Sequence, residues 1–314
     1  MYAESIAALL RRAGARLILR DWLSSNQVVF SDRDHGGAVV DTGHVTRSTQ
    51  TVALVQHVLG DLPLARIVNT HLHSDHCGGN SALAECWPDA TIGVPEGYRD
   101  RLDPWDDNRL SYRHMGQLCG WFRPGQYLGA GQDIELGALR WQCHSTPGHD
   151  PDALVLFQPD TGLLLSGDAL WEDRLAIIFP ALTGAGGFDA AHEALNTIER
   201  LAPQAVIPGH GEAFSNVAAA LLASRRRLDA FAAAPDRHRR YSLRVMVVYH
   251  LLECREVERE TLIRWITETP IFRDAMACPP GETPTREQAC DIIESLLVDG
   301  ALRAEQSRIR IASG

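Results

Sequence analysis

Short apolar runs alternate with helical stretches over the first two-thirds of the chain. The short runs are bounded by turn residues, as strands are. The stretches between them place apolar residues three or four positions apart, as on one face of a helix. We predict strands at 16–19, 27–30, 38–40, 65–69, 141–143, 154–157, 163–165 and 205–207, and helices around 6–10 and at 49–59 and 190–201. This alternation predicts an α/β fold in which helices cover a core of strands.

The pattern changes after Phe214. An Ala- and Leu-rich segment predicts one long helix, which Pro235 ends because proline cannot continue a helix. Three further helical segments lead to a short run in which polar and apolar residues alternate, and this run predicts a strand. Three helices before a small β element are typical of a winged-helix module. The predicted elements are helices at 217–234, 243–253, 259–268 and 286–299, and a strand at 308–311.

Residues 98–130 interrupt the alternation. They hold several aromatic side chains among many Arg and Asp residues: Tyr98, Trp105, Tyr112, Trp121, Phe122 and Tyr127. A long insertion of this kind is often a lid or a binding loop. The alternative is a solvated helical excursion that its own aromatic side chains hold together. The sequence leaves both interpretations open.

The charge of the chain restricts its partners. The formal net charge is −10, and all 30 basic residues are Arg, a usage that indicates a GC-rich bacterial genome. A chain this acidic is not expected to coat nucleic acid. One basic cluster remains, formed by Arg225, Arg226, Arg227, Arg237, Arg239 and Arg240. It is interpreted either as a solvated helix face or as an anchor for an anionic substrate.

The location of the protein is predicted from its apolar runs and its cysteines. No run reaches the roughly 18 apolar residues that a membrane span needs, so no membrane partner is expected. The N-terminal segment lacks the basic-then-apolar order of a secretory signal. The seven cysteines are scattered and include no CxxC pair, which predicts reduced thiols rather than disulfides. These features together predict a cytoplasmic protein.

The strongest chemical signal is the segment Thr70–His76, which follows the predicted strand 65–69. His71 and His73 stand two positions apart on an extended chain, so their side chains point the same way and can bind one ion. Asp75 and His76 come after a turn and can reach a second ion nearby. Two neighbouring ions can share a hydroxide that is nucleophilic at neutral pH, because the metals lower the pKa of water. The segment therefore predicts a dinuclear metal site.

Three single residues extend this set. His149, Asp168 and His210 each follow a glycine in a turn after a predicted strand. One such residue alone is usually polar surface. Together, and in this order, they match the ligand pattern of a known family.

The sequence from about residue 15 to residue 215 resembles the metallo-β-lactamase superfamily. The resemblance implies an αββα sandwich with two divalent metal ions at one edge, zinc being favoured and Fe or Mn also compatible. It implies that His71, His73 and His149 bind the first ion, that Asp75, His76 and His210 bind the second, and that Asp168 bridges them. We take Asp75 and Asp168 as the catalytic residues. Asp41 corresponds to a family aspartate that orients a ligand, and the alternative interpretation is a simple turn residue.

Asp168 also distinguishes branches of the family. Antibiotic-degrading members typically have Cys or Ser in place of a bridging carboxylate, so the Gly167-Asp168 pair resembles glyoxalase II, lactonases and ribonuclease-like members. The C-terminal part resembles the winged-helix appendage of a branch that includes an endoribonuclease. Cys77 is expected to pack away from the metals. We predict a catalytic domain at 1–216, a linking helix at 217–235 and a winged-helix-like domain at 236–314.

Four functions compete at this stage. The favoured one is a hydrolase in which a metal-bridging hydroxide attacks a small-molecule ester, thioester or lactone. The second is a phosphodiesterase acting on RNA or single-stranded DNA, a partner class that the net charge disfavours. The third is a mononuclear-iron sulfur dioxygenase, and the fourth a non-enzymatic binding protein, which the complete ligand set argues against. A homodimer is expected only by analogy with the family.

Overall fold

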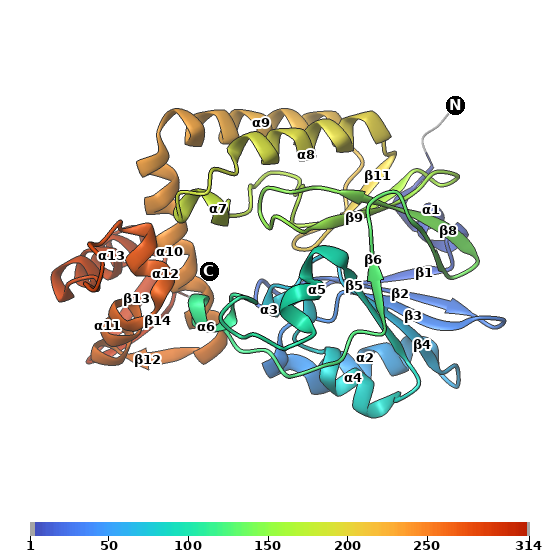
Figure 1. The fold of residues 1–314 in the computed structure, drawn as a ribbon, viewed down its shortest axis with the longest axis horizontal. Coiled ribbons are helices and arrows are strands. Elements are labelled where there is room, and N and C mark those ends of the chain that lie inside the picture. The colour runs from blue at the N-terminus through green and yellow to red at the C-terminus, as the bar shows by residue number, and fades with distance from the viewer. Residues whose placement is uncertain (1–3, 313–314) are drawn as a thin grey trace.

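Two β-sheets lie face to face in the computed structural model, which describes residues 4–312 (Figure 1). The first sheet is antiparallel from β1 to β3 and parallel from β3 to β6. Its order is β1 (Ala15–Ile18), β2 (Gln27–Asp32), β3 (Gly36–Val40), β4 (Leu64–Val68), β5 (Thr91–Pro95) and β6 (Gln126–Leu128). The order of the second is β11 (Ala205–Pro208), β10 (Leu163–Gly167), β9 (Leu154–Gln158), β8 (Leu139–Ser145) and β7 (Asp133–Leu136).

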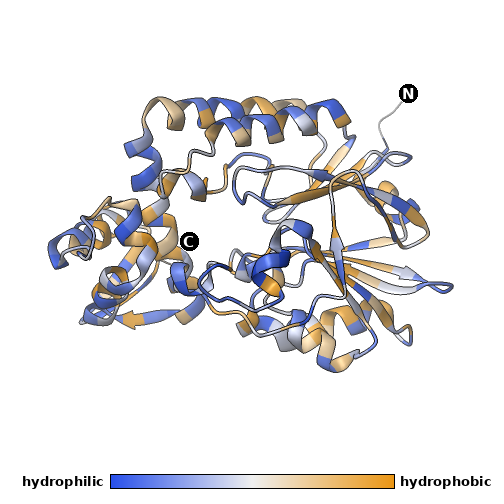
Figure 2. Cartoon of the chain, viewed as in Figure 1, coloured by the Kyte–Doolittle hydropathy of each residue, from blue (hydrophilic) through white to orange (hydrophobic). Residues whose placement is uncertain are grey.

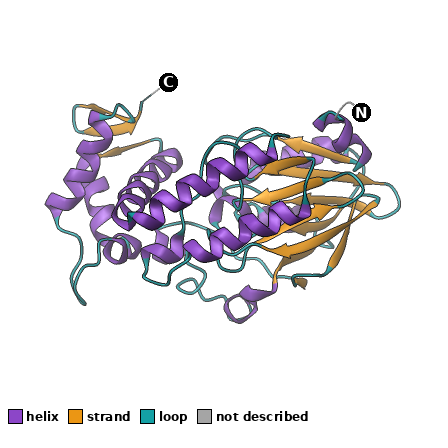
Figure 3. Ribbon diagram, turned by 90° about the horizontal axis from the view of Figure 1, so that it is seen from above, coloured by secondary structure: helices purple, strands orange, loops and turns teal. Residues whose placement is uncertain are grey.

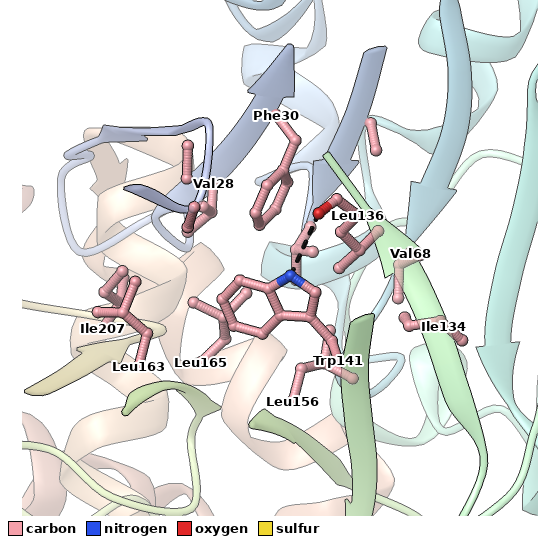
Figure 4. Packing of buried hydrophobic residues seen from close by; sticks show 14 of the residues in the cluster. Val28, Phe30, Val68, Ile134, Leu136, Trp141, Leu156, Leu163, Leu165 and Ile207 are labelled. Atoms are coloured by element: carbon pink, nitrogen blue, oxygen red, sulfur yellow. Dashed lines mark hydrogen bonds between the residues drawn. The ribbon is translucent and has the colours of Figure 1, made fainter. Parts of the chain in front are cut away.

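The main core lies between the two sheets (Figure 4). Phe30 of the first sheet meets Trp141 of the second edge to face, with ring centroids 5.4 Å apart. Both side chains are fully buried. The indole Nε1 of Trp141 donates a hydrogen bond to the carbonyl oxygen of Leu136, so burying this ring leaves no polar atom unpaired. These contacts fix the spacing of the sheets whose edges carry the candidate site.

Helices cover the outer face of each sheet. α2 (Ser48–Leu59) and α4 (Asn80–Cys86) pack on the first sheet, and α8 (Phe188–Leu201) and α9 (Val217–Ala233) pack on the second. Figure 2 shows apolar positions along the strands, whereas α9 mixes polar and apolar positions, as expected of a surface helix. These four layers confirm the predicted αββα sandwich.

The C-terminal part is helical with a small sheet, as predicted, and lies at one end of the sandwich (Figure 3). Its helices are α10 (Pro235–Cys254), α11 (Arg259–Glu268), α12 (Pro270–Ala275) and α13 (Arg286–Val298). Its sheet has the order β12 (Glu256–Glu258), β14 (Arg308–Ile311) and β13 (Leu302–Glu305). None of the helices within residues 4–312 combines the length and apolarity that crossing a membrane requires.

Shorter elements complete the chain: α1 (Ile6–Arg12), η1 (Val45–Arg47), α3 (Ser74–Cys77), η2 (Glu96–Tyr98), α5 (Arg99–Leu102), α6 (Tyr112–Met115) and α7 (Phe179–Leu182). The predicted start of the first C-terminal helix at residue 243 is wrong, because α10 begins at Pro235. Proline ends α9 but is also favoured in the first turn of a helix. The domain boundaries at 216 and 235 stay predictions, and residues 1–3 and 313–314 of the terminal domains lie outside the described part.

The insertion at 98–130 has features of both interpretations that the sequence left open, a binding loop and an excursion held together by its own aromatic side chains. Its rings pack on one another, since Trp105 lies 5.3 Å from Phe122 and 6.2 Å from Tyr112 between ring centroids. Its tip reaches the C-terminal helices, where His114 Nε2 lies 3.4 Å from Asp274 Oδ2. Gly116, also at the tip, lines the cavity described below.

His238 ties α10 to the segment that leads into α7. Its Nε2 accepts a hydrogen bond from the backbone N–H of Ile178 at 3.1 Å. The imidazole is 1% exposed and lies against the rings of Phe188 and Phe231. Because the acceptor nitrogen must be unprotonated, this contact requires a neutral His238.

We expect His238 to make the protein less stable as the pH falls from 6.5 to 4. Burial lowers the pKa of His238 from 6.5 to about 4, so the unfolded chain binds the proton more readily than the folded one. The stability that depends on neutral His238 is therefore fully present above pH 6.5 and is lost below it, by up to about 3 kcal/mol.

Urea denaturation at pH 7.5 and 4.5 tests this expectation. In His238→Gln the side chain does not titrate, and its amide oxygen can still accept from Ile178, so this variant should lose less stability between the two pH values than the wild type. His57→Gln, at an exposed position of α2, should behave as the wild type does. An equal loss in His238→Gln and in the wild type would show that His238 does not carry the effect.

Candidate metal centre

The strand order brings all seven predicted ligands to one edge of the sandwich. His71, His73, Asp75 and His76 follow the end of β4, and the last two belong to the short helix α3. The other three follow β8, β10 and β11. β8 and β10 both run antiparallel to β9, and β11 runs parallel to β10, so these three strands end at the same edge. The local sequence and the sheet topology therefore place the set together.

Glycines before two of the ligands, Asp168 and His210, allow the close approach of the ligand loops. A Cβ at Gly209 would collide with Asp168 Oδ1 and would lie 2.7 Å from His76 Cε1. A Cβ at Gly167 would lie 2.7 Å from Thr70 Oγ1, and that residue also has a φ of +49°. Larger residues at these two positions would push the ligand loops apart.

Three imidazoles form the first cluster. His73 Nδ1 lies 3.1 Å from His71 Nε2 and 2.7 Å from His149 Nε2. All three side chains are 9% exposed or less. Three ring nitrogens therefore converge on one small volume.

A carboxylate and two imidazoles form the second cluster. Asp75 Oδ2 lies 3.0 Å from His210 Nε2, and His76 belongs to the same cluster. Asp168 lies between the two clusters: its Oδ1 is 3.3 Å from His76 Nε2, and its Oδ2 is 3.4 Å from His149 Nε2. The structure thus brings together all seven predicted ligands, with Asp168 in the position expected of a bridge.

Hydrogen bonds at the far side of the rings fix which nitrogen faces the cluster. His149 Nδ1 donates to the carbonyl oxygen of Ile177 at 2.7 Å, and His76 Nδ1 donates to Asp41 Oδ2 at 2.8 Å. The hydroxyl of Thr70 donates to Asp41, so its oxygen accepts from His71 Nδ1 at 3.1 Å. With the proton on Nδ1, a free lone pair on Nε2 faces the cluster in His71, His76 and His149. Metal ligation requires such a lone pair.

Burial keeps the first cluster unprotonated. It lowers the pKa of His73 and of His149 to about 4 and that of His71 well below its usual value. Neutral imidazole is the form that binds a metal ion. No proton is then expected between these rings near neutral pH.

In the second cluster, the charges of neighbouring side chains outweigh the effect of burial on the pKa values. Burial opposes a charge on His76, but Asp168, Asp41 and Asp75 outweigh it and hold the pKa of His76 well above its usual value. Burial likewise opposes the charge on Asp75, but His76 and His210 lower the pKa of that carboxyl to about 2. Buried carboxylates around His76 thus favour a positive charge at this position.

The donor set fits two divalent ions. Three overlapping triads, His71–His73–His149, His71–His76–Asp168 and Asp75–His76–His210, each have ligand atoms within 4.8 Å of one another. Among residues 4–312, the buried His76 Nε2 makes no hydrogen bond, although Asp168 Oδ1 lies 3.3 Å away as an ion-pair partner. A buried polar atom of this kind needs a partner, and a cation between the rings would provide it. Imidazole and carboxylate ligands suit Zn, Fe and Mn alike.

Two tryptophans cover the side of the second cluster. Trp22 stacks on His210 with ring centroids 5.4 Å apart, and Trp171 meets the same imidazole edge to face at 5.5 Å. Trp171 Nε1 also donates a hydrogen bond to Asp168 Oδ1 at 3.2 Å. The guanidinium of Arg174 lies over the Trp22 ring at 4.7 Å. These rings restrict the positions of Asp168 and His210.

A cavity of about 560 Å³ opens directly onto the clusters. His73, Asp75, His149, Asp168 and His210 form one end of its lining. The lining continues with mostly apolar side chains of α10 and its neighbours. A volume of this size is typical of small-molecule sites.

The sequence did not reveal several residues around the clusters. Asp150 Oδ2 lies 3.8 Å from His73 Nε2, and it follows His149 directly in the sequence. Tyr249 of α10 lines the cavity, and its hydroxyl lies 3.3 Å from Ser74 Oγ. No local signal near Tyr249 indicates this position, because α10 reaches the site only through tertiary packing. Cys77 packs as expected, with Sγ 3.2 Å from the hydroxyl of Tyr112.

The basic cluster lies away from the candidate site. Among the described residues, none of its six arginines lines the cavity. Arg225 instead forms an ion pair with Glu199 at 2.8 Å, between α9 and α8. This arrangement favours the interpretation of a solvated helix face.

Comparison with known sequences completes this description. The Metallo-beta-lactamase superfamily profile matches residues 20–210, which include all seven residues of the two clusters. The chain belongs to the metallo-β-lactamase superfamily. The resemblance inferred from the sequence is thus confirmed at the level of the superfamily.

Curated relatives within the superfamily match about half of this chain. A hydroxyacylglutathione hydrolase from Xylella fastidiosa (strain 9a5c) is 30% identical over 172 residues, 54% of each chain. One from Legionella pneumophila (strain Lens) is 23% identical over 177 residues, 56% of this chain and 59% of its own. The chain therefore spans only about half to three-fifths of the length of these relatives.

Solved structures share the fold over almost the whole chain. A beta-lactamase domain protein from Burkholderia ambifaria has a TM-score of 0.56 at 21% identity, covering 96% of this chain and 93% of its own. A metallo-beta-lactamase family protein from Thermus thermophilus has a TM-score of 0.54 at 19% identity, covering 95% and 98%. This coverage indicates that the C-terminal helices belong to the shared architecture.

Proposed function

We propose that this chain is a dinuclear metal-dependent hydrolase that cleaves a small-molecule ester, thioester or lactone. The observation that carries the proposal is the mostly apolar cavity that opens directly onto the histidine–aspartate clusters. The hydroxyacylglutathione hydrolases among the relatives support a thioester as one substrate class. The proposed partner is thus a small molecule rather than a nucleic acid, in keeping with the net charge of −10.

The reaction adds water to an acyl carbon and breaks its bond to oxygen or sulfur. Bound divalent ions would supply a water of lowered pKa and would polarise the acyl oxygen. His71, His73 and His149 would hold one ion and Asp75, His76 and His210 the other, with Asp168 between them. Zinc is the proposed metal.

The chain itself would position the substrate and move one proton. Apolar side chains of the cavity would exclude bulk water from the acyl group. Oδ2 of Asp75 lies 3.0 Å from Nε2 of His210, so these two atoms would hold the same ion, and Oδ1 of Asp75 would take the proton from the attacking water. Transfer of that proton to the leaving alcohol or thiol would complete the reaction.

A parallel substrate screen tests the proposal. We expect the purified protein to hydrolyse an aryl ester, a lactone or an acyl thioester, and to lose this activity after EDTA treatment and regain it with Zn²⁺. Bis-(p-nitrophenyl) phosphate should be a much poorer substrate, because the cavity is mostly apolar and the arginine cluster lies elsewhere.

Two results would overturn this assignment. Cleavage of the phosphodiester alone would favour a nuclease. Oxygen consumption with a persulfide, supported by a single iron ion, would favour a sulfur dioxygenase.

A further inference from the structure

The cavity extends past the metal clusters into the C-terminal part of the chain. Its lining there comes from four separate elements: α10, α11, α13 and β14. The residues concerned are Val248, Leu252, Trp265, Leu296 and Ile311. The C-terminal helices therefore form a wall of the same cavity that exposes the clusters.

This wall carries little charge. Arg244 is a cation in this wall, and its guanidinium forms an ion pair with Asp299 at 2.6 Å. His250 stacks on Trp265 with ring centroids 4.0 Å apart, and burial lowers its pKa to about 4, so it is neutral near pH 7. Burial also raises the pKa of Glu253. An anionic ligand would lose its hydration here without a free cation to pair with, because Arg244 is already paired.

We propose that this end of the cavity binds an extended apolar acyl group of the substrate. The inference deepens the proposed function, on which the identity of the occupant as an acyl group rests. An acetyl group at the clusters would leave most of the cavity of about 560 Å³ to water against apolar walls. A longer chain would displace that water and gain free energy with each methylene buried.

A chain-length series tests the proposal. p-Nitrophenyl acetate, butyrate and octanoate share one leaving group and differ only in the acyl chain. Octanoate has six more methylenes than acetate, and each buried methylene can change binding by up to about fourfold, so even partial burial at about twofold each should raise kcat/KM at least about thirtyfold. Values that stay level or fall along the series would overturn the proposal, while hydrolysis of the acetate would still support the hydrolase function.

A substitution in the wall tests the location. Val248→Phe places a larger side chain in the cavity, so the ratio of kcat/KM for octanoate to that for acetate should fall by at least about tenfold. Val298→Phe adds the same ring at a position that is 83% exposed on the last turn of α13, and should leave the ratio as in the wild type. Equal ratios in all three proteins would exclude Val248 from the acyl site.

Binding without turnover separates this proposal from the proposed function. In EDTA, calorimetric titration of the wild type with uncharged 1-butanol, 1-hexanol and 1-octanol should show affinity that rises with chain length, and Val248→Phe should reduce this rise. Such binding, in a protein that hydrolyses none of the esters, would support the apolar site and contradict the hydrolase. Affinity that does not depend on chain length would overturn the apolar site.

Discussion

Replacing Asp168 with alanine is expected to remove one of the two metal ions and to lower kcat/KM for the best ester or thioester substrate by at least about a thousandfold. Among residues 4–312, Asp168 is the one carboxylate that lies within 3.5 Å of both clusters, through Oδ1 to His76 and Oδ2 to His149. Its loss leaves His76 with fewer carboxylates to stabilise positive charge nearby. The ion that remains would lack the partner needed to polarise the substrate and water together.

Metal analysis and steady-state kinetics of the same preparation check this expectation. Asp173→Ala is a matched control, because Asp173 lies on the same loop but is exposed. It should bind two ions and turn over substrate as the wild type does. Full activity of Asp168→Ala, whatever its metal content, would contradict the dinuclear account.

The second large effect is expected at Asp41, which binds no metal in the proposed centre. Its carboxylate is 3% exposed and accepts hydrogen bonds from the backbone N–H and the hydroxyl of Thr70 and from His76 Nδ1. Asp41 also has a φ of +57°, a conformation that asparagine tolerates well. Asp41→Asn therefore changes the chemistry of the side chain with little change in shape.

We expect Asp41→Asn to weaken binding of the second ion about ten- to a hundredfold. The amide cannot accept as many hydrogen bonds as the carboxylate, so either Thr70 or His76 loses its partner. Competition with a fluorescent zinc chelator measures the two affinities separately. The affinity of the first ion should change less, and Asp34→Asn, in the exposed turn before β3, should change neither. If the affinities of both ions fell equally, Asp41 would not act by orienting His76.

Local sequence was sufficient to predict most of the sandwich, and together with the family resemblance it named the seven residues that the structure brings together. The strand ends carry the ligands, and strands with apolar runs are the elements that periodicity identifies best. Five strands were not predicted, because each spans five residues or fewer and gives little periodicity: β5, β6, β7, β12 and β13. α4 and α12 were missed as well, because they span only seven and six residues.

Other features depend on contacts between distant segments. Trp22 and Trp171 lie far apart in the sequence but flank the same imidazole. Tyr249 reaches Ser74 only because α10 packs beside α3. Nothing in the periodicity of α10 distinguishes the residues that face the cavity from those that face the C-terminal core. The apolar cavity could therefore be recognised only in the folded chain.

The central claim is that the two clusters bind two ions side by side, and anomalous X-ray diffraction from crystals of the zinc-loaded protein tests it most directly. The account predicts two peaks at the zinc edge, each about 2.0–2.2 Å from its ligand atoms. One should lie among His71, His73 and His149, the other among Asp75, His76 and His210, with Asp168 in contact with both. A single peak in fully loaded crystals, or peaks away from these residues, would contradict the account.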